Sequence, residues 1–242
     1  MPIRKLKFTP GGFYHIFNRG NGRRDIFLND KDRYRFLQAM YLSNSKDAGF
    51  TVADLEKIKG GYSLDKIKDL LDKKNVFYNP LVRVCTDCLM PNHFHFLVEE
   101  IEEGGVSYFM QKLGNSYARY FSIRHNYPGS LFQGRFKAVE VDSDDQLKYL
   151  LIYINVLNPA QLIEPELKEK GIQDIEKVWN KIESYSWSGH QEFMDRRNSV
   201  IIDKGLLGKI FSNSQEYSTF AKSILEGKQT FKWRAIEGLV LE

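Results

Sequence analysis

Apolar and polar positions recur along the chain with two different periods, which predicts a mixture of strands and helices. Alternation rich in aromatic and β-branched residues predicts strands at 12–18, 81–88, 93–99 and 131–141. Apolar positions spaced three and four apart predict helices at 30–42, 106–124 and 143–154. We expect Pro159 to end the last of these helices, because proline cannot continue the backbone hydrogen-bond ladder.

Two further regions have a different character. Residues 43–80 are polar and rich in Lys and Asp, which predicts an insertion with short helices at 52–59 and 64–73. After Pro159 the pattern becomes one of amphipathic helices joined by polar loops, at about 172–182, 204–211 and 217–226. We therefore expect residues 1–160 to form one domain that carries the insertion, and residues 161–242 to form a helical extension.

Composition narrows the class of protein. With 242 residues, of which 42% are hydrophobic, the chain can bury a sizeable core, so wholesale disorder is excluded. The longest unbroken apolar run is the six residues 149–154, whereas a membrane span needs about 20. Two cysteines cannot build a disulfide framework. We expect a cytoplasmic protein with no membrane partner.

The net charge of +4 hides an uneven distribution. Residues 1–40 hold nine basic and three acidic side chains, and residues 107–138 hold five basic side chains, no acidic ones and eight aromatic rings. Cations interleaved with rings suit a nucleic-acid surface, and the alternative is a solvated helix face over an aromatic core. The candidate phosphate contacts are Arg19, Arg23, Arg24, Lys112, Arg119, Arg135 and Lys137.

The sharpest local feature is His93-Phe94-His95. Side chains alternate along a strand, so both imidazoles leave one face and can chelate one divalent ion. A structural zinc site that adds Cys85 and Cys88 is an alternative. It is disfavoured because cysteines three apart on a regular strand point to opposite faces, and because the pairs lie too close together in sequence.

Four segments resemble the single-tyrosine HUH transposases, and most of all their REP-associated branch. Three carry the resemblance of the sheet: YHIFNRGN at 14–21, CLMPNHFHFLV at 88–98 and FQGRFK at 132–137. The fourth is the helix that ends YINVLNP at 153–159. The resemblance implies an α+β fold, with a ferredoxin-like or RRM-like antiparallel sheet and packed helices, to which the insertion and the helical extension are added.

The resemblance also implies a metal-dependent enzyme that cleaves and rejoins single-stranded or hairpin DNA through a 5′-phosphotyrosine, as in DNA transposition. Carried over by position, Tyr153 is the nucleophile, and His93 and His95 bind Mg²⁺ or Mn²⁺. The family pattern places a third ligand, Asn or Gln, four residues after the tyrosine, where this chain has Leu157. We assign that ligand to Asn158, one residue later, with Asn155 as the second candidate.

Two alternatives stay open. A non-catalytic single-stranded nucleic-acid-binding protein could use the same scaffold, because a regular helix would not place Tyr153 and Asn158 on one face. His15 could lie near the site, although we interpret it as a histidine of the core or sheet face. Whether the chain forms a homodimer is also left open.

Overall fold

The chain folds around a four-stranded antiparallel sheet, seen in a computed structural model that describes residues 6–46, 69 and 78–227. The strands are β1 (Phe13–Arg19), β2 (Val82–Met90), β3 (His93–Glu100) and β4 (Lys137–Val141), in the order β2-β3-β1-β4. The insertion predicted at 43–80, with its helices at 52–59 and 64–73, falls almost wholly outside the described residues.

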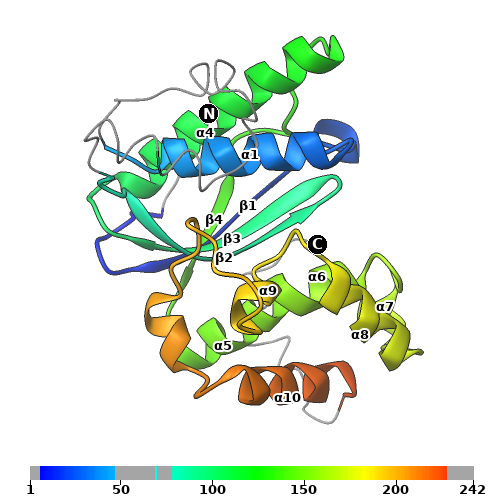
Figure 1. Cartoon of the computed structure of the whole chain (residues 1–242). Coiled ribbons are helices and arrows are strands. Elements are labelled where there is room, and N and C mark those ends of the chain that lie inside the picture. The colour runs from blue at the N-terminus through cyan, green and yellow to red at the C-terminus, as the bar shows by residue number, and fades with distance from the viewer. Residues whose placement is uncertain (1–5, 47–68, 70–77, 228–242) are drawn as a thin grey trace.

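Two helices cover one face of the sheet (Figure 1). They are α1 (Asp30–Ser43), which Asn29 caps by accepting two backbone N–H groups, and α4 (Gly105–His125). Their apolar faces meet the alternate positions Tyr14 and Ile16 of β1 and Phe94 and Phe96 of β3 in one core. The connectivity β1-α1-β2-β3-α4-β4 with this strand order is ferredoxin-like, so the predicted α+β class is confirmed.

The opposite face of the sheet is covered by the segment that follows β4 (Figure 1). It begins with α5 (Asp144–Ile152), which Ser143 caps, and continues through the π-helix η2 (Tyr153–Leu157) into α6 (Asn158–Ala160). The helices predicted at 172–182, 204–211 and 217–226 correspond to α8 (Ile175–Ser184), η3 (Gly205–Lys209) and α10 (Ser214–Leu225). Two short helices that were not predicted, α7 (Leu167–Lys170) and α9 (His190–Phe193), lie among them. They share a second core with α5 and η2, and the domain boundary at 160 stays a prediction.

The C-terminal extension also pairs with the outer edge of β2. Leu89 N–H donates to the Trp187 carbonyl at 2.8 Å, Gly189 N–H donates to the Asp87 carbonyl at 2.8 Å, and Asp203 N–H donates to the Val84 carbonyl at 3.0 Å. These bonds satisfy backbone groups that an edge strand would otherwise expose. The extension is therefore attached to the sheet along the strand next to β3.

Two expectations about boundaries are wrong. The strand predicted at 131–141 begins only at Lys137, because the preceding residues form a loop in which only Phe132 bridges to Gly20. Pro159 does not end the helical segment before it, since it occupies the first turn of α6, where no intrahelical N–H donor is needed. The short helix η1 (Asn21–Arg23) follows β1.

Candidate functional site

His93 and His95 lie on the same face of β3, as the alternation of a strand requires. Their ring centroids are 5.0 Å apart. Phe94 and Phe96 point the other way, into the core under α1 and α4. His95 is fully buried and His93 is half-buried at the start of the strand, so the pair runs from the surface into the interior.

Tyr153 packs its ring against this histidine face. The centroid of its ring lies 5.5 Å from that of His95 and 6.2 Å from that of His15, and both contacts are edge to face. The side chain is 1% exposed, and burial raises the pKa of its phenol well above the ordinary value. The predicted nucleophile and the two predicted metal ligands are thus brought together from α5–η2 and β3.

A π-helix places Asn158 one helical turn after Tyr153. The backbone N–H of Asn158 donates to the carbonyl of Tyr153, five residues earlier, and its side-chain Nδ2 donates to the same oxygen at 3.0 Å. The bonding partner in an α-helix would be four residues earlier. The wider turn therefore accommodates the extra residue between Tyr153 and Asn158. The sequence alone did not show whether the two residues would lie one turn apart.

The two candidates for a third ligand have different environments. Asn155 Oδ1 accepts from Thr86 Oγ1 of β2 at 2.6 Å, so it is used within the core. Asn158 Oδ1 is buried and has no hydrogen-bond partner among the described residues. A buried amide oxygen without a partner is costly, and a cation would satisfy it.

The donor types fit a divalent ion, although the ligand set is unusual. Among the residues that the structure describes, no group of three or more His, Cys, Asp or Glu side chains is arranged to hold a metal. Two imidazoles on one strand and one amide oxygen suit Mn²⁺ better than a hard ion such as Mg²⁺. A site on His93 and His95 would therefore need Asn158, water or a DNA phosphate to complete it.

Each histidine is held through its Nδ1 atom. His93 Nδ1 lies 2.6 Å from Asn92 Oδ1, and His95 Nδ1 lies 2.9 Å from Nε2 of His15. His15 is fully buried on β1, with its ring nearly parallel to that of His95. The structure thus places His15 at the site, and sequence reasoning did not identify Asn92, whose position next to His93 was the only available signal.

Five of the predicted phosphate contacts gather around the His93 end of the sheet. They are Arg19, Arg23, Arg24, Arg135 and Lys137. Arg19 pairs with His93 in the β1–β3 ladder, and its Nε donates to Gln133 Oε1 at 2.7 Å, which ties the loop before β4 to this end. Arg24 stacks on Tyr127, with its guanidinium carbon 4.6 Å from the ring centroid. The cluster combines cations and a ring beside the histidines.

The other two candidates lie elsewhere. Lys112 Nζ donates to the Ser45 carbonyl at 2.8 Å, next to the start of β2 and so at the opposite end of that strand from Met90, which pairs with His93. Arg119 is exposed on α4, whose apolar side packs on the sheet. Most of the aromatic rings of α4 are core residues, so the alternative of a solvated face over an aromatic core describes this helix.

Cys85 and Cys88 are both buried, and burial raises the pKa of each thiol. The expectation that they point to opposite faces is wrong, because a bulge between Val84 and Thr86 shifts the register of β2 and puts both in the same core. They contact apolar side chains of that core, as small hydrophobic residues do.

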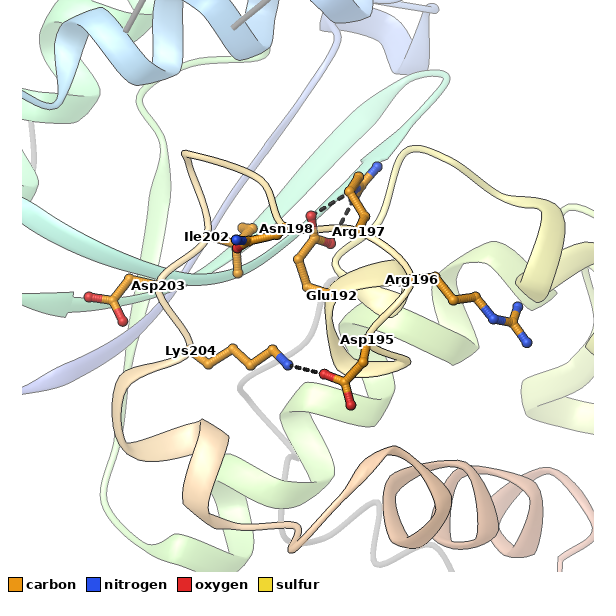
Figure 2. A pocket seen from close by; sticks show the side chains of 8 residues that line it. All are labelled: Glu192, Asp195, Arg196, Arg197, Asn198, Ile202, Asp203 and Lys204. Atoms are coloured by element: carbon orange, nitrogen blue, oxygen red, sulfur yellow. Dashed lines mark hydrogen bonds and ion pairs between the residues drawn. The ribbon is translucent and has the colours of Figure 1, made fainter. Parts of the chain in front are cut away.

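A hollow of about 600 Å³ opens in the C-terminal extension (Figure 2). Its lining residues are Glu192, Asp195, Arg196, Arg197, Asn198, Ile202, Asp203 and Lys204. Four of its charged side chains pair with one another: Arg197 Nε and Nη2 bind the two oxygens of Glu192, and Lys204 binds Asp195 at 3.0 Å. The other two, Asp203 and Arg196, pair with Arg83 and Glu183 outside the hollow. None of the predicted site residues lines it, and its balanced charge favours no particular ligand.

One segment of the chain matches a known protein family. Residues 65–156, which contain β2, β3, α4, β4, α5 and Tyr153, match the family described as "Transposase IS200 like". This segment is similar to the IS200-like transposases. The family that the motifs resembled is thereby confirmed, and Asn158 lies two residues beyond the matched segment.

Two further comparisons concern the whole chain. One solved structure, a REP-associated tyrosine transposase bound to a REP hairpin, has a TM-score of 0.47 and 11% sequence identity, and covers 84% of this chain and 94% of its own. No curated protein matches the chain. Within the part of the chain that the structure describes, no helix is long and apolar enough to cross a membrane.

Proposed function

We propose that this protein is a DNA transposase that cleaves and rejoins single-stranded DNA through a covalent bond to Tyr153. The observation that carries the proposal is the contact of the Tyr153 ring with His95, 5.5 Å between centroids, which joins the proposed nucleophile to the proposed metal ligands. The family match supports DNA transposition as the process. Hairpin-bearing DNA is the proposed substrate, as the motif resemblance implies.

The reaction conserves one phosphodiester. The phenol oxygen of Tyr153 bonds to the scissile phosphorus, the bond from phosphorus to the 3′ oxygen breaks, and the proton lost by the phenol is balanced by the proton that the 3′ oxygen gains. The product is a 5′-phosphotyrosine and a free 3′-OH, so rejoining needs no ATP.

We further propose that His93, His95 and Asn158 hold Mn²⁺ or Mg²⁺. Held by these residues, a divalent ion would supply charge neutralisation at the phosphate oxygens and help to orient the phosphorus for attack. The buried Asn158 Oδ1 without a partner supports its inclusion, and the bond of Asn155 to Thr86 argues against the alternative ligand. Arg19, Arg23, Arg24, Arg135 and Lys137 are the proposed phosphate contacts beside the site, and they supply affinity rather than base choice.

The decisive experiment is a denaturing gel of the protein with a labelled hairpin oligonucleotide, with and without Mn²⁺. We expect a covalent adduct that needs the metal and is absent in Tyr153→Phe, while Tyr149→Phe, one helical turn earlier, retains it. An adduct in Tyr153→Phe would assign the nucleophile elsewhere.

A second candidate is a protein that binds single strands without cleaving them. It is favoured by the 1% exposure of Tyr153, which keeps the phenol away from any DNA phosphate in this conformation. Its signature in the same experiment is a salt-sensitive complex on a native gel, with no adduct under any metal.

A further inference from the structure

The two proposed metal ligands, His93 and His95, share a hydrogen-bonding pattern at the ring atom that faces away from a metal bound at Nε2. Each Nδ1 faces a polar atom of another residue: Asn92 Oδ1 for His93, at 2.6 Å, and His15 Nε2 for His95, at 2.9 Å. A neutral imidazole carries one proton, so a partner at one nitrogen decides whether the other nitrogen has a lone pair to offer a cation.

The direction of the Asn92 contact follows from a third bond. Asn92 Nδ2 donates to the backbone carbonyl of Arg23 at 3.1 Å, and a carbonyl can only accept. The amide group is therefore oriented with its oxygen towards His93. Because that oxygen also can only accept, the proton of His93 lies on Nδ1 and the lone pair lies on Nε2.

The backbone around Asn92 holds the residue in place. It sits in the turn between β2 and β3, and its own carbonyl accepts from the N–H of Gly20 at 2.8 Å. A side chain at Gly20 would collide with the Arg24 carbonyl, since an added Cβ would lie 2.1 Å from that oxygen. The close approach of the loop after β1 thus brings the Arg23 carbonyl within reach of Asn92.

The contact between His95 and His15 allows two arrangements, since either ring can donate. Only one of them leaves a lone pair on Nε2 of His95: the one in which Nδ1–H of His95 donates to Nε2 of His15. Both rings are fully buried and nearly parallel, with centroids 5.1 Å apart and 19° between planes, so neither can turn to solvent. His15 touches Tyr153 as well, at 6.2 Å between centroids.

We propose that Asn92 and His15 are positioning residues that hold His93 and His95 in the tautomer protonated on Nδ1, so that both present Nε2 to one divalent cation. This inference rests on the proposed function for its purpose, but the tautomers themselves are a property of the metal-free protein. Partners of this kind around metal-binding histidines commonly change metal affinity by about 10- to 100-fold when removed.

The first test reads the tautomers directly. Long-range ¹H–¹⁵N correlation spectra of the full chain without metal distinguish a ring protonated on Nδ1 from one protonated on Nε2. We expect both His93 and His95 to be protonated on Nδ1. A proton on Nε2 of either ring would overturn the assignment for that residue, whether or not the protein cleaves DNA.

The second test measures Mn²⁺ affinity by electron paramagnetic resonance. We expect Asn92→Ala and His15→Leu each to bind Mn²⁺ about 10- to 100-fold more weakly than the wild type. The matched control is Asn18→Ala, because Asn18 lies at the same end of the sheet and its Nδ2 donates to the Gly134 carbonyl. His15→Gln and Asn92→Asp restore an acceptor, and we expect them to recover most of the affinity.

The outcomes separate the metal site from the positioning role. If wild type and a His93→Ala, His95→Ala double variant bind Mn²⁺ equally, the proposed metal site is wrong, and the spectra alone decide the tautomers. If the double variant loses binding but Asn92→Ala and His15→Leu match Asn18→Ala, the positioning role is wrong. Circular dichroism melts show whether each variant is folded. If Asn92→Ala or His15→Leu is unfolded, the Mn²⁺ affinity of Asn92→Asp or His15→Gln is compared with that of the wild type instead.

Discussion

The carbonyl oxygen of Tyr153 accepts two hydrogen bonds from Asn158, one from the backbone N–H and one from side-chain Nδ2 at 3.0 Å. The two residues are thereby fixed one wide turn apart, although five positions separate them in the sequence. π-helical turns of this kind frequently occur at functional sites. The Oδ1 atom of Asn158 is buried and has no hydrogen-bond partner among the described residues, which is the basis of its proposed role as a ligand.

Asn158→Ala and Asn155→Ala distinguish the two candidates for the third ligand. We expect Asn158→Ala to weaken Mn²⁺ binding by at least about tenfold, the loss seen even for partners outside the ligand shell. We expect Asn155→Ala to leave the affinity unchanged but to lower the free energy of unfolding by about 1–3 kcal/mol, because Thr86 Oγ1 loses its buried partner. Isothermal titration calorimetry and urea denaturation measure the two effects, and the reverse pattern would reassign the ligand.

The C-terminal extension packs so closely against β2 at Gly189 that this position has no room for a side chain. An added Cβ would lie 2.1 Å from Thr86 Oγ1 and 3.3 Å from Asn155 Oδ1, so we expect Gly189→Ala to lower the free energy of unfolding by about 1–3 kcal/mol. Gly114, within α4, has no atom within 4 Å of such a Cβ. We expect Gly114→Ala to stabilise by about 0.5–1 kcal/mol, because alanine favours the helix. Equal effects in urea denaturation would contradict this packing.

The exposed arginines after β1 should contribute to the salt dependence of DNA binding. We expect Arg23→Ala with Arg24→Ala to reduce the slope of log affinity against log salt by about 0.7 for each single-strand phosphate that the variant no longer neutralises. Lys177→Ala, at an exposed position of α8 in the extension, is the control and should leave the slope unchanged. Fluorescence anisotropy with a labelled oligonucleotide measures both, and an unchanged slope in the double variant would remove these arginines from the interface.

His190 should make the protein sensitive to acid. Burial, and then the positive charge of Arg196, lowers the pKa of this imidazole to about 4 in the folded chain, from an ordinary value near 6.5. Between those values the unfolded chain binds a proton that the folded chain does not. The free energy of unfolding therefore falls as the pH drops from about 6.5 to 4, by up to about 1.4 kcal/mol per unit.

His190→Gln tests this assignment, because glutamine can still bond to the Tyr217 hydroxyl, which lies 3.0 Å from His190 Nδ1. We expect urea denaturation to show a smaller loss of stability between pH 6.5 and 4.5 in the variant than in the wild type. The same loss in both proteins would assign the acid sensitivity to other groups.

Local patterns in the sequence predicted the strands, the helices at 30–42 and 106–124, and the shared face of His93 and His95, while the arrangement of the sheet came from the resemblance to a family. They could do so because strand alternation and helical spacing are short-range properties, and because the alternation from Phe94 to Phe96 leaves only one face for the histidines. The same patterns placed Tyr153 on a helix that had to be covered on nearly every side.

Only the tertiary structure decided how the distant parts meet. The hydrogen bond between His15 and His95 spans 80 positions and depends on the register of β1 and β3. The hydrogen bond from Asn92 Nδ2 to the Arg23 carbonyl forms because the β2–β3 turn packs against the loop after β1. The π-helix that returns Asn158 to Tyr153, and the bulge that gives Cys85 and Cys88 one face, each add one residue to a regular repeat. A regular period assumes a constant repeat, so it cannot predict where one extra residue is inserted.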